Sequence, residues 1–236
     1  MKKTQNILKH IKSSLLITCL LSSFNAYCAD NNLFYQSVNS EIKGLMREYK
    51  GVKPLQAELF DSNDNSIKSF IEGTSNSKAD HALAVQYFPK LAINGTDTSF
   101  CFIFFDSKKD IFSQYKSTSN MSDSEILNYL TWHEMGHCFA KHENFSVNPK
   151  INEFIADAFA ISVSINRDKN YLSTKIIKNI AKLDLKDIHA NKPELEQFLL
   201  TTLNANFFIK KRTVNEIVEM IKIYYEESNL KDTKKN

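Results

Sequence analysis

Glycine and proline are scarce in this chain of 236 residues, which has only 5 Gly and 4 Pro. Average proteins have about 7% Gly and 5% Pro, so this scarcity argues against a turn-rich all-β fold and favours long helices. The composition is otherwise ordinary, with 42% hydrophobic and 24% charged residues, and no internal repeat is visible. These values exclude intrinsic disorder, a collagen and a coiled coil. We expect one large globular domain or two small lobes around a sizeable core.

Acidic residues are absent before Asp30. Four lysines lie among the first twelve residues, and a short apolar run follows at 15–21. This order, with small and polar residues through Ala29, is typical of a secretory signal peptide. The apolar run is shorter than the ~20 residues of a transmembrane helix, although an uncleaved membrane anchor is the alternative. Cleavage after Cys28 is preferred because it puts a small residue at both recognition positions. We therefore predict a signal peptide at 1–28 and a periplasmic or secreted protein.

Loss of residues 1–28 would change the formal charge from +3 to −1, because the segment has four basic and no acidic side chains. A nearly neutral chain gives no electrostatic support for nucleic-acid or membrane-surface binding, and we expect neither a nucleic-acid partner nor a stable membrane anchor after cleavage. Of the four cysteines, Cys101 and Cys138 would remain. In an oxidising compartment they form either a disulfide or two buried thiols, and their spacing does not decide between the two.

Hydrophobic patterns place strands in the first half of the chain and helices in the second, which predicts an α+β fold. Strand-like runs occupy 82–88 and 100–105, and the Asn94-Gly95 turn signal between them predicts antiparallel pairing. The polar stretch 61–80 predicts a surface loop. The predicted helices span 38–50, 122–142, 150–166, 171–183, 193–206 and 213–228.

Two of these helices begin with capping-box patterns, and a third begins at Pro149. The capping boxes pair Ser122 with Glu125 and Thr213 with Glu216. We expect an N-terminal α+β lobe at 29–143, a helical C-terminal lobe at 144–230 and a disordered tail at 231–236.

The helix at 122–142 carries the sequence His133-Glu134-Met135-Gly136-His137, an H-E-x-x-H motif. Residues four apart lie on one helical face, so both imidazoles can reach one metal ion. Glu134 can address a water bound to that ion. The alternative is a chance match in which the two histidines are solvated or belong to the core.

The next helix carries the sequence Asn152-Glu153-Phe154-Ile155-Ala156-Asp157. Glu153 and Asp157 are also four residues apart. Two helices joined by a short connection pack antiparallel, which can bring Glu153 opposite the two histidines. Carboxylates on an otherwise apolar helix are costly unless an ion or a partner satisfies them, and the alternative is an exposed acidic pair.

These two motifs together resemble the gluzincin class of zinc metallopeptidases, which combine H-E-x-x-H with a downstream E-x-x-x-D. The resemblance covers the two predicted helices that carry the motifs. It implies that His133, His137 and Glu153 are zinc ligands, that Glu134 is the general base, and that Asp157 orients a ligating imidazole. It also implies a zincin-like fold, with a small antiparallel or mixed sheet in the N-terminal lobe, two active-site helices and a helical C-terminal lobe.

The metzincin pattern, in which a third histidine follows the motif, does not fit this spacing. Ala140 stands at its Gly position, Glu143 stands where the histidine should be, and His142 is one residue early. At about 100° per residue, His142 lies about 140° around the helix from His137. We expect His142 to face solvent near the helix end.

The motifs predict an exported zinc metallopeptidase that hydrolyses peptide bonds by Glu134-assisted attack of a zinc-bound water. A catalytically silent, zinc-stabilised binding protein and a zinc hydrolase of a non-peptide bond are the alternatives. An oxyanion donor is needed besides zinc, and His189 is our candidate, with a solvated loop histidine as the other interpretation. Tyr171, Tyr224 and Tyr225 are further candidates.

A peptide or protein substrate is expected to bind in extended form along one of the two predicted strands. Aromatic side chains crowd the second of these strands at Phe102, Phe104 and Phe105. We interpret them as core rather than as a substrate subsite. The sequence contains no signal for the oligomeric state.

Overall fold

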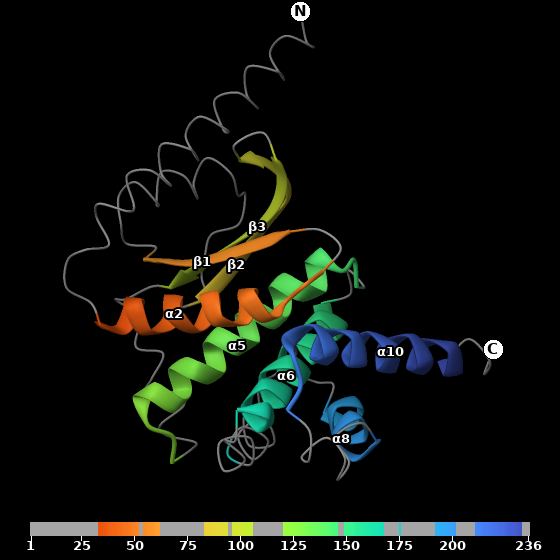
Figure 1. Ribbon diagram of the computed structural model, residues 1–236. Helices are drawn as coiled ribbons and strands as arrows, with labels where there is room; N and C mark the ends of the chain where they lie inside the picture. Colours follow the sequence, from red (N-terminus) through yellow and green to blue (C-terminus); the bar gives the residue numbers. More distant parts are fainter. Residues whose placement is uncertain are drawn as a thin grey trace, which may run out of the picture.

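The computed structural model describes residues 33–51, 54–61, 83–93, 96–105, 120–145, 149–167, 175, 192–201 and 211–232. It is a mixed α+β fold with a small three-stranded sheet and mostly helical content, so the predicted class is confirmed at this level (Figure 1). The elements are α2 (Leu33–Glu48), β1 (Leu55–Asp61), β2 (Leu83–Ile93), β3 (Thr96–Phe105), α5 (Asp123–His142), α6 (Pro149–Asn166), α8 (Lys192–Thr201) and α10 (Val214–Asp232). Among the described helices, none is both long and apolar enough to cross a membrane.

The sheet has the strand order β1-β3-β2, with β3 in the centre. β2 pairs antiparallel with β3, which confirms the predicted hairpin, and its register shifts between Phe88 and Leu91. Pro89 lies within this shift, where its missing N–H does not interrupt a regular ladder. β1 pairs parallel with β3, from Leu55 opposite Ser99 to Asp61 opposite Phe105.

β1 was not predicted, and its last residue, Asp61, was expected in the surface loop 61–80. The strand is nevertheless visible as an alternation, because Leu55, Ala57 and Leu59 are separated by polar residues. Parallel pairing is difficult to predict, since no turn signal links the two strands. Residues 62–80 of the predicted loop lie outside the described residues, as do the predicted signal peptide 1–28 and, except for Lys175, the predicted helix 171–183.

Both faces of β3 are buried. Cys101, Ile103 and Phe105 point into the main hydrophobic core with the helices. On the other face, the ring of Phe102 packs 4.5 Å from that of Phe100 and its centroid is 6.1 Å from that of Phe104. Phe102, Phe104 and Phe105 are therefore core residues, as predicted, rather than a substrate subsite.

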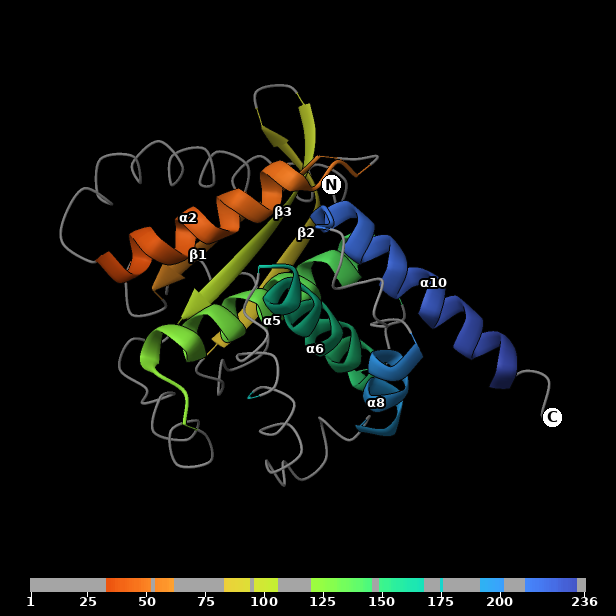
Figure 2. The same ribbon diagram turned by 60° about the horizontal axis from the view of Figure 1, so that its bottom comes forward.

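The helices form layers on one side of the sheet. α5 packs against β2 and α6, and α6 in turn packs against α8 and α10 (Figures 1 and 2). α2 contacts both β1 and α5, so it covers the sheet and the central helix together. This arrangement leaves α5 buried along most of its length.

The start of α5 is fixed by the predicted capping box. The Ser122 backbone N–H donates to Glu125 Oε2 at 2.7 Å, and the Glu125 backbone N–H donates to Ser122 Oγ at 3.4 Å. The helix ends after His142, where Asn144 adopts a left-handed conformation with φ 56°. The Phe145 backbone N–H then donates to Ala140 O at 2.9 Å, which closes the last turn and allows the chain to reverse towards α6.

The other predicted helices are present with different ends. α2 begins at Leu33 and ends at Glu48 rather than spanning 38–50. α8 covers Lys192–Thr201 of the predicted span 193–206, and residues 202–206 lie outside the described residues. α10 follows the predicted capping box, in which the Thr213 backbone N–H donates to Glu216 Oε2 at 2.8 Å. It continues to Asp232, past its predicted end at 228.

Candidate metal centre

The two motif histidines lie one turn apart on the face of α5 that meets α6. Both are buried, with His133 6% and His137 8% exposed. Their Nε2 atoms are 3.1 Å apart, and the two rings are perpendicular with centroids 4.7 Å apart. The i, i+4 spacing of the motif therefore brings both imidazole nitrogens to one point, as predicted.

Glu153 on α6 faces these two nitrogens. Its Oε2 lies 3.3 Å from His133 Nε2, and its Oε1 lies 3.5 Å from His137 Nε2. The three side chains offer ligand atoms that all lie within 4.8 Å of one another. His133, His137 and Glu153 thus form a cluster that could hold a metal ion.

Asp157 lies one turn further along α6 and contacts the back of the His133 ring. Its Oδ1 is 2.8 Å from His133 Nδ1. This bond leaves Nε2 directed at Glu153 and His137, and it is the contact that the resemblance implies for Asp157. The same Oδ1 also accepts a hydrogen bond of 2.9 Å from the Tyr129 hydroxyl, a residue that the sequence analysis did not single out.

The opposite nitrogen of His137 is in a different situation. Nδ1 of His137 and Oδ1 of Asn152 are both buried and have no hydrogen-bond partner within the described part of the chain. The Asn152 side chain lies near the ring, and its hydrogen-bonding capacity raises the pKa of His137 and so partly offsets the effect of burial. One unsatisfied donor or acceptor in a buried position costs about 1–3 kcal/mol, so this pair of atoms needs an explanation.

Burial and the neighbouring charges push the pKa values of the two histidines in opposite directions. Burial lowers the pKa of His133, but the charge of Asp157 and its hydrogen bond outweigh this and raise the pKa well above its ordinary value. Burial and the charge of His133 lower the pKa of His137 to about 4. At neutral pH, and without a metal ion, His133 is therefore the protonated ring and His137 the neutral one.

The close contact of α5 with α6 depends on Gly136, between the two histidines. A Cβ atom at this position would lie 2.6 Å from Ala156 Cα, 3.1 Å from Ala156 O and 3.2 Å from Phe159 Cβ. Such distances leave no room for a side chain, because carbon atoms in contact are about 3.5–4.0 Å apart. Glycine thus allows the α6 backbone to approach the motif closely enough for Glu153 to reach both imidazoles.

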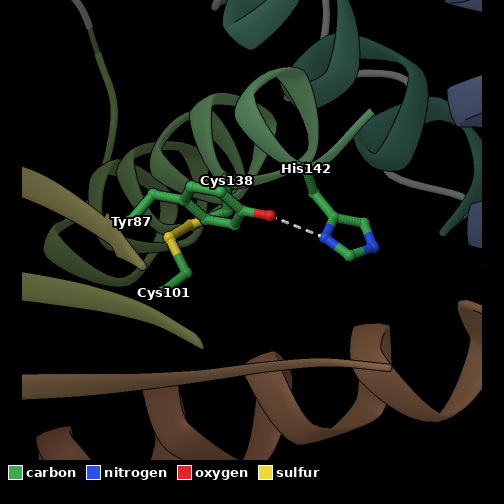
Figure 3. Close-up of a disulfide and its surroundings, with 4 residues drawn as sticks. All are labelled: Tyr87, Cys101, Cys138 and His142. Atoms are coloured by element: carbon green, nitrogen blue, oxygen red, sulfur yellow. Dashed lines mark hydrogen bonds between the residues drawn. A yellow bond between two sulfur atoms is a disulfide. The ribbon is translucent and has the colours of Figure 1, made fainter. Parts of the chain in front are cut away.

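The predicted pair of cysteines forms a disulfide in the structure. Cys101 on β3 and Cys138 on α5 are joined with a Cα–Cα distance of 5.9 Å (Figure 3). Cys138 directly follows His137, so the bridge attaches the helix to the central strand beside the cluster of His133, His137 and Glu153. The sequence left a disulfide and two buried thiols open, and the structure has the disulfide.

His142 does not face solvent, and this part of the sequence analysis was wrong. The residue is 8% exposed, and its Nδ1 is 2.9 Å from the Tyr87 hydroxyl on β2 (Figure 3). It lies off the ligand face, as its helical angle predicted, but that other face of α5 is covered by β2 and α2. The ring packs edge-on against Tyr49 and Tyr87. The hydrogen bond of His142 with Tyr87 therefore connects the end of α5 to β2 of the sheet.

Of the remaining residues predicted for the site, the structure describes three and leaves two outside the described ranges. Glu134 is buried on α5 next to His133, and its charge contributes to the raised pKa of that ring. Tyr224 packs against Phe154 with ring centroids 5.8 Å apart. Tyr225 packs against Phe145 at 5.9 Å. His189, the predicted oxyanion donor, and Tyr171 lie outside the described residues.

Tyr129 and Asn152 were not predicted as site residues, and each lies behind one of the two imidazoles. A signal was available for both, since Tyr129 stands one turn before His133 and Asn152 directly precedes Glu153.

The cluster offers two nitrogens and one carboxylate oxygen to a metal ion. A second carboxylate, that of Glu134, lies on α5 between the two histidines. Comparison with protein-family models, curated proteins and solved structures finds no match to this chain.

Proposed function

We propose that this protein is an exported zinc metallopeptidase whose metal ligands are His133, His137 and Glu153. The observation that carries the proposal is the convergence of the ligand groups: the two Nε2 atoms are 3.1 Å apart, and the two oxygens of Glu153 lie 3.3 Å and 3.5 Å from His133 Nε2 and His137 Nε2 respectively. A tetrahedral zinc ion with bonds of about 2.0–2.1 Å separates its ligand atoms by about 3.3 Å. Two histidines and one carboxylate leave a fourth position open, which is the pattern of catalytic rather than structural zinc sites.

The two unpartnered buried atoms also support a metal ion at this position. If His137 used Nε2 as a ligand, its remaining proton would be on Nδ1 and would require an acceptor. Asn152 Oδ1 is a buried acceptor close to this ring. The Asp157 carboxylate already plays the equivalent part for His133. Each imidazole would then have one group that holds its orientation.

Glu134 is the proposed general base. A zinc ion, when bound, lowers the pKa of a coordinated water to about 7 and polarises a substrate carbonyl. The Glu134 carboxylate would accept a proton from the water and deliver it to the leaving amine nitrogen. Its burial beside His133 keeps bulk water from competing for that proton.

The topology points to β2 as the strand along which an extended peptide would bind. β3 has partners on both sides, whereas β2 lies at one edge of the described sheet and packs on α5. Extended peptides bind to such edges through backbone hydrogen bonds. A zincin-like arrangement of a sheet edge above two active-site helices belongs to the same proposal, as does membership of the gluzincin class, which rests on the two motifs alone.

Export is supported by the N-terminal sequence pattern and by the disulfide. Disulfides persist in the periplasm and outside the cell, where the surroundings are oxidising. The bridge between Cys101 and Cys138 would form in that setting. We therefore place the activity in the periplasm or in the medium.

Metal analysis combined with cleavage of a peptide library tests the proposal. We expect one equivalent of zinc and cleavage for the wild type, and zinc without cleavage for Glu134→Gln. Glu153→Gln should lose zinc. Glu143→Gln is the matched control, since it changes a carboxylate that Tyr49 binds at the far end of α5. Retention of a full equivalent of zinc by Glu153→Gln would show that the ligand assignment is wrong.

A wild type with one equivalent of zinc and no cleavage of any peptide would favour a silent binding protein. Zinc together with turnover of non-peptide esters or amides, but not of peptides, would favour a hydrolase of a different bond. Absence of zinc from protein refolded or reconstituted with the ion would refute the metal site itself. The three outcomes are distinct because metal content and cleavage are measured separately.

A further inference from the structure

A tyrosine hydroxyl lies behind the carboxylate that orients the first histidine. Tyr129 is on α5, one turn before His133, and its ring centroid is 5.8 Å from that of His133. Its hydroxyl donates to Asp157 Oδ1 at 2.9 Å, and the same oxygen is 2.8 Å from His133 Nδ1. One carboxylate oxygen of α6 is therefore held by two groups of α5.

Both bonds lie in the interior, where a polar atom has few alternative partners. Tyr129 and Asp157 are 5% and 3% exposed. A carboxylate bound only by an imidazole could rotate about its side-chain torsions and carry the ring with it. The second bond, from a rigid phenol on the same helix as the imidazole, restricts that rotation. In such a buried network, each member fixes the positions of the others.

We infer that Tyr129 is a positioning residue of the metal centre, acting through Asp157 on the orientation of His133. The inference rests on the proposed function only in taking His133 as a metal ligand. The hydroxyl is not among the candidate ligand atoms, which belong to His133, His137 and Glu153. Its part is to keep Oδ1 at a place where His133 must direct Nε2 towards Glu153 and His137.

The variant Tyr129→Phe removes the hydroxyl and keeps the ring, so the packing around it is preserved. Changing a group bonded directly to a ligating histidine typically weakens metal binding about 10–100-fold. Tyr129 is one bond further away, and we expect its loss to weaken zinc binding by about threefold to tenfold. Affinity is measured by competition with a chelator, so the test does not depend on peptidase activity.

Tyr49→Phe is the matched control. Tyr49 is also a buried tyrosine, and its hydroxyl donates to the carboxylate of Glu143, the residue that follows the end of α5. Both variants lose one hydroxyl–carboxylate bond, but only Tyr129 is linked to a proposed ligand. Tyr49→Phe should keep wild-type zinc affinity. Equal affinities for the two variants would overturn the inference and leave the metal site intact.

A double variant separates positioning from general packing. If Tyr129 acts through Asp157, then Tyr129→Phe should change zinc affinity no further in an Asp157→Ala background. A purely structural effect would instead lower the affinity by the same factor in both backgrounds, and this result would refute the inference.

Cobalt substitution gives a second readout should Asp157→Ala fail to fold. The visible absorption of bound Co²⁺ reports ligand geometry, and it should change in Tyr129→Phe but not in Tyr49→Phe. An unchanged spectrum in both variants would count against the inference. A wild type that binds neither Zn²⁺ nor Co²⁺ would refute the proposed function and with it the basis of this inference.

Discussion

Replacing Gly136 by alanine is the most direct test of how the two motif helices are held together. The added methyl group would lie 2.6 Å from Ala156 Cα, about 1 Å closer than carbon atoms normally approach. The contact is with backbone, so no rotamer change can relieve it. The α6 helix must move away from α5, and Glu153 moves with it.

The expected cost follows from two opposing effects. Overpacking costs about 1–3 kcal/mol, and contact with backbone places this site in the upper half of that range. Alanine is better than glycine inside a helix by about 1 kcal/mol. The net destabilisation is therefore about 1–2 kcal/mol, which lowers Tm by about 2–8 °C for a chain of this size. Zinc affinity should also fall, and by more than the loss of folding stability alone would cause, because metal–ligand distances must stay within about 0.2 Å of their ideal values.

Gly44→Ala provides the control for this experiment. Gly44 is also in a helix, α2, but among the residues that the structure describes a Cβ atom there would meet only Arg167 Nη2, at 4.0 Å. Thermal unfolding and chelator competition should show Gly44→Ala equal to or more stable than the wild type, with unchanged zinc affinity. If Gly136→Ala behaves in the same way as Gly44→Ala in both assays, the close approach of the helices is not what positions Glu153.

Two further predictions concern protons and the disulfide. Zinc must displace the proton of His133, so one proton should be released per ion at pH 6, below the raised pKa of that ring, while His137, with a pKa of about 4, releases none there. Calorimetry in buffers of different ionisation enthalpy measures this, and zinc binding without proton release at pH 6 would contradict it. The Cys101→Ser, Cys138→Ser double variant opens a loop of 37 residues and should lose about 4 kcal/mol of stability in denaturant unfolding. A loss below about 1 kcal/mol would contradict the role of the bridge.

Local patterns account for what could be predicted from the sequence. The capping box at Ser122 and the spacing of His133 and His137 each act within a few residues, and both α5 and the cluster follow from them. β1 escaped prediction because its pairing with β3 depends on residues more than forty positions away. Non-local pairing leaves little trace in a short window of sequence.

His142 illustrates a different limit. Its angle around the helix correctly placed it away from the ligand face, but the step from there to solvent assumed that α5 has one buried face. α5 is covered by α6 on one side and by β2 and α2 on the other. Tyr129 and Asn152 stand at positions in the sequence that could have marked them, but their contacts depend on how α5 and α6 meet rather than on the spacing within one helix.

The short connection between α5 and α6 has a consequence for the order of folding. His133 and Asp157 are only 24 residues apart, so closing this helical hairpin costs little chain entropy. The hydrogen bonds at the end of α5 join residues much further apart in the sequence: 55 positions between Tyr87 and His142, and 94 positions between Tyr49 and Glu143. Contacts between residues that are close in the sequence form first, and we therefore expect α5 and α6 to pair before the sheet packs on them. The cluster would then be able to bind a metal ion before the rest of the chain packs around it.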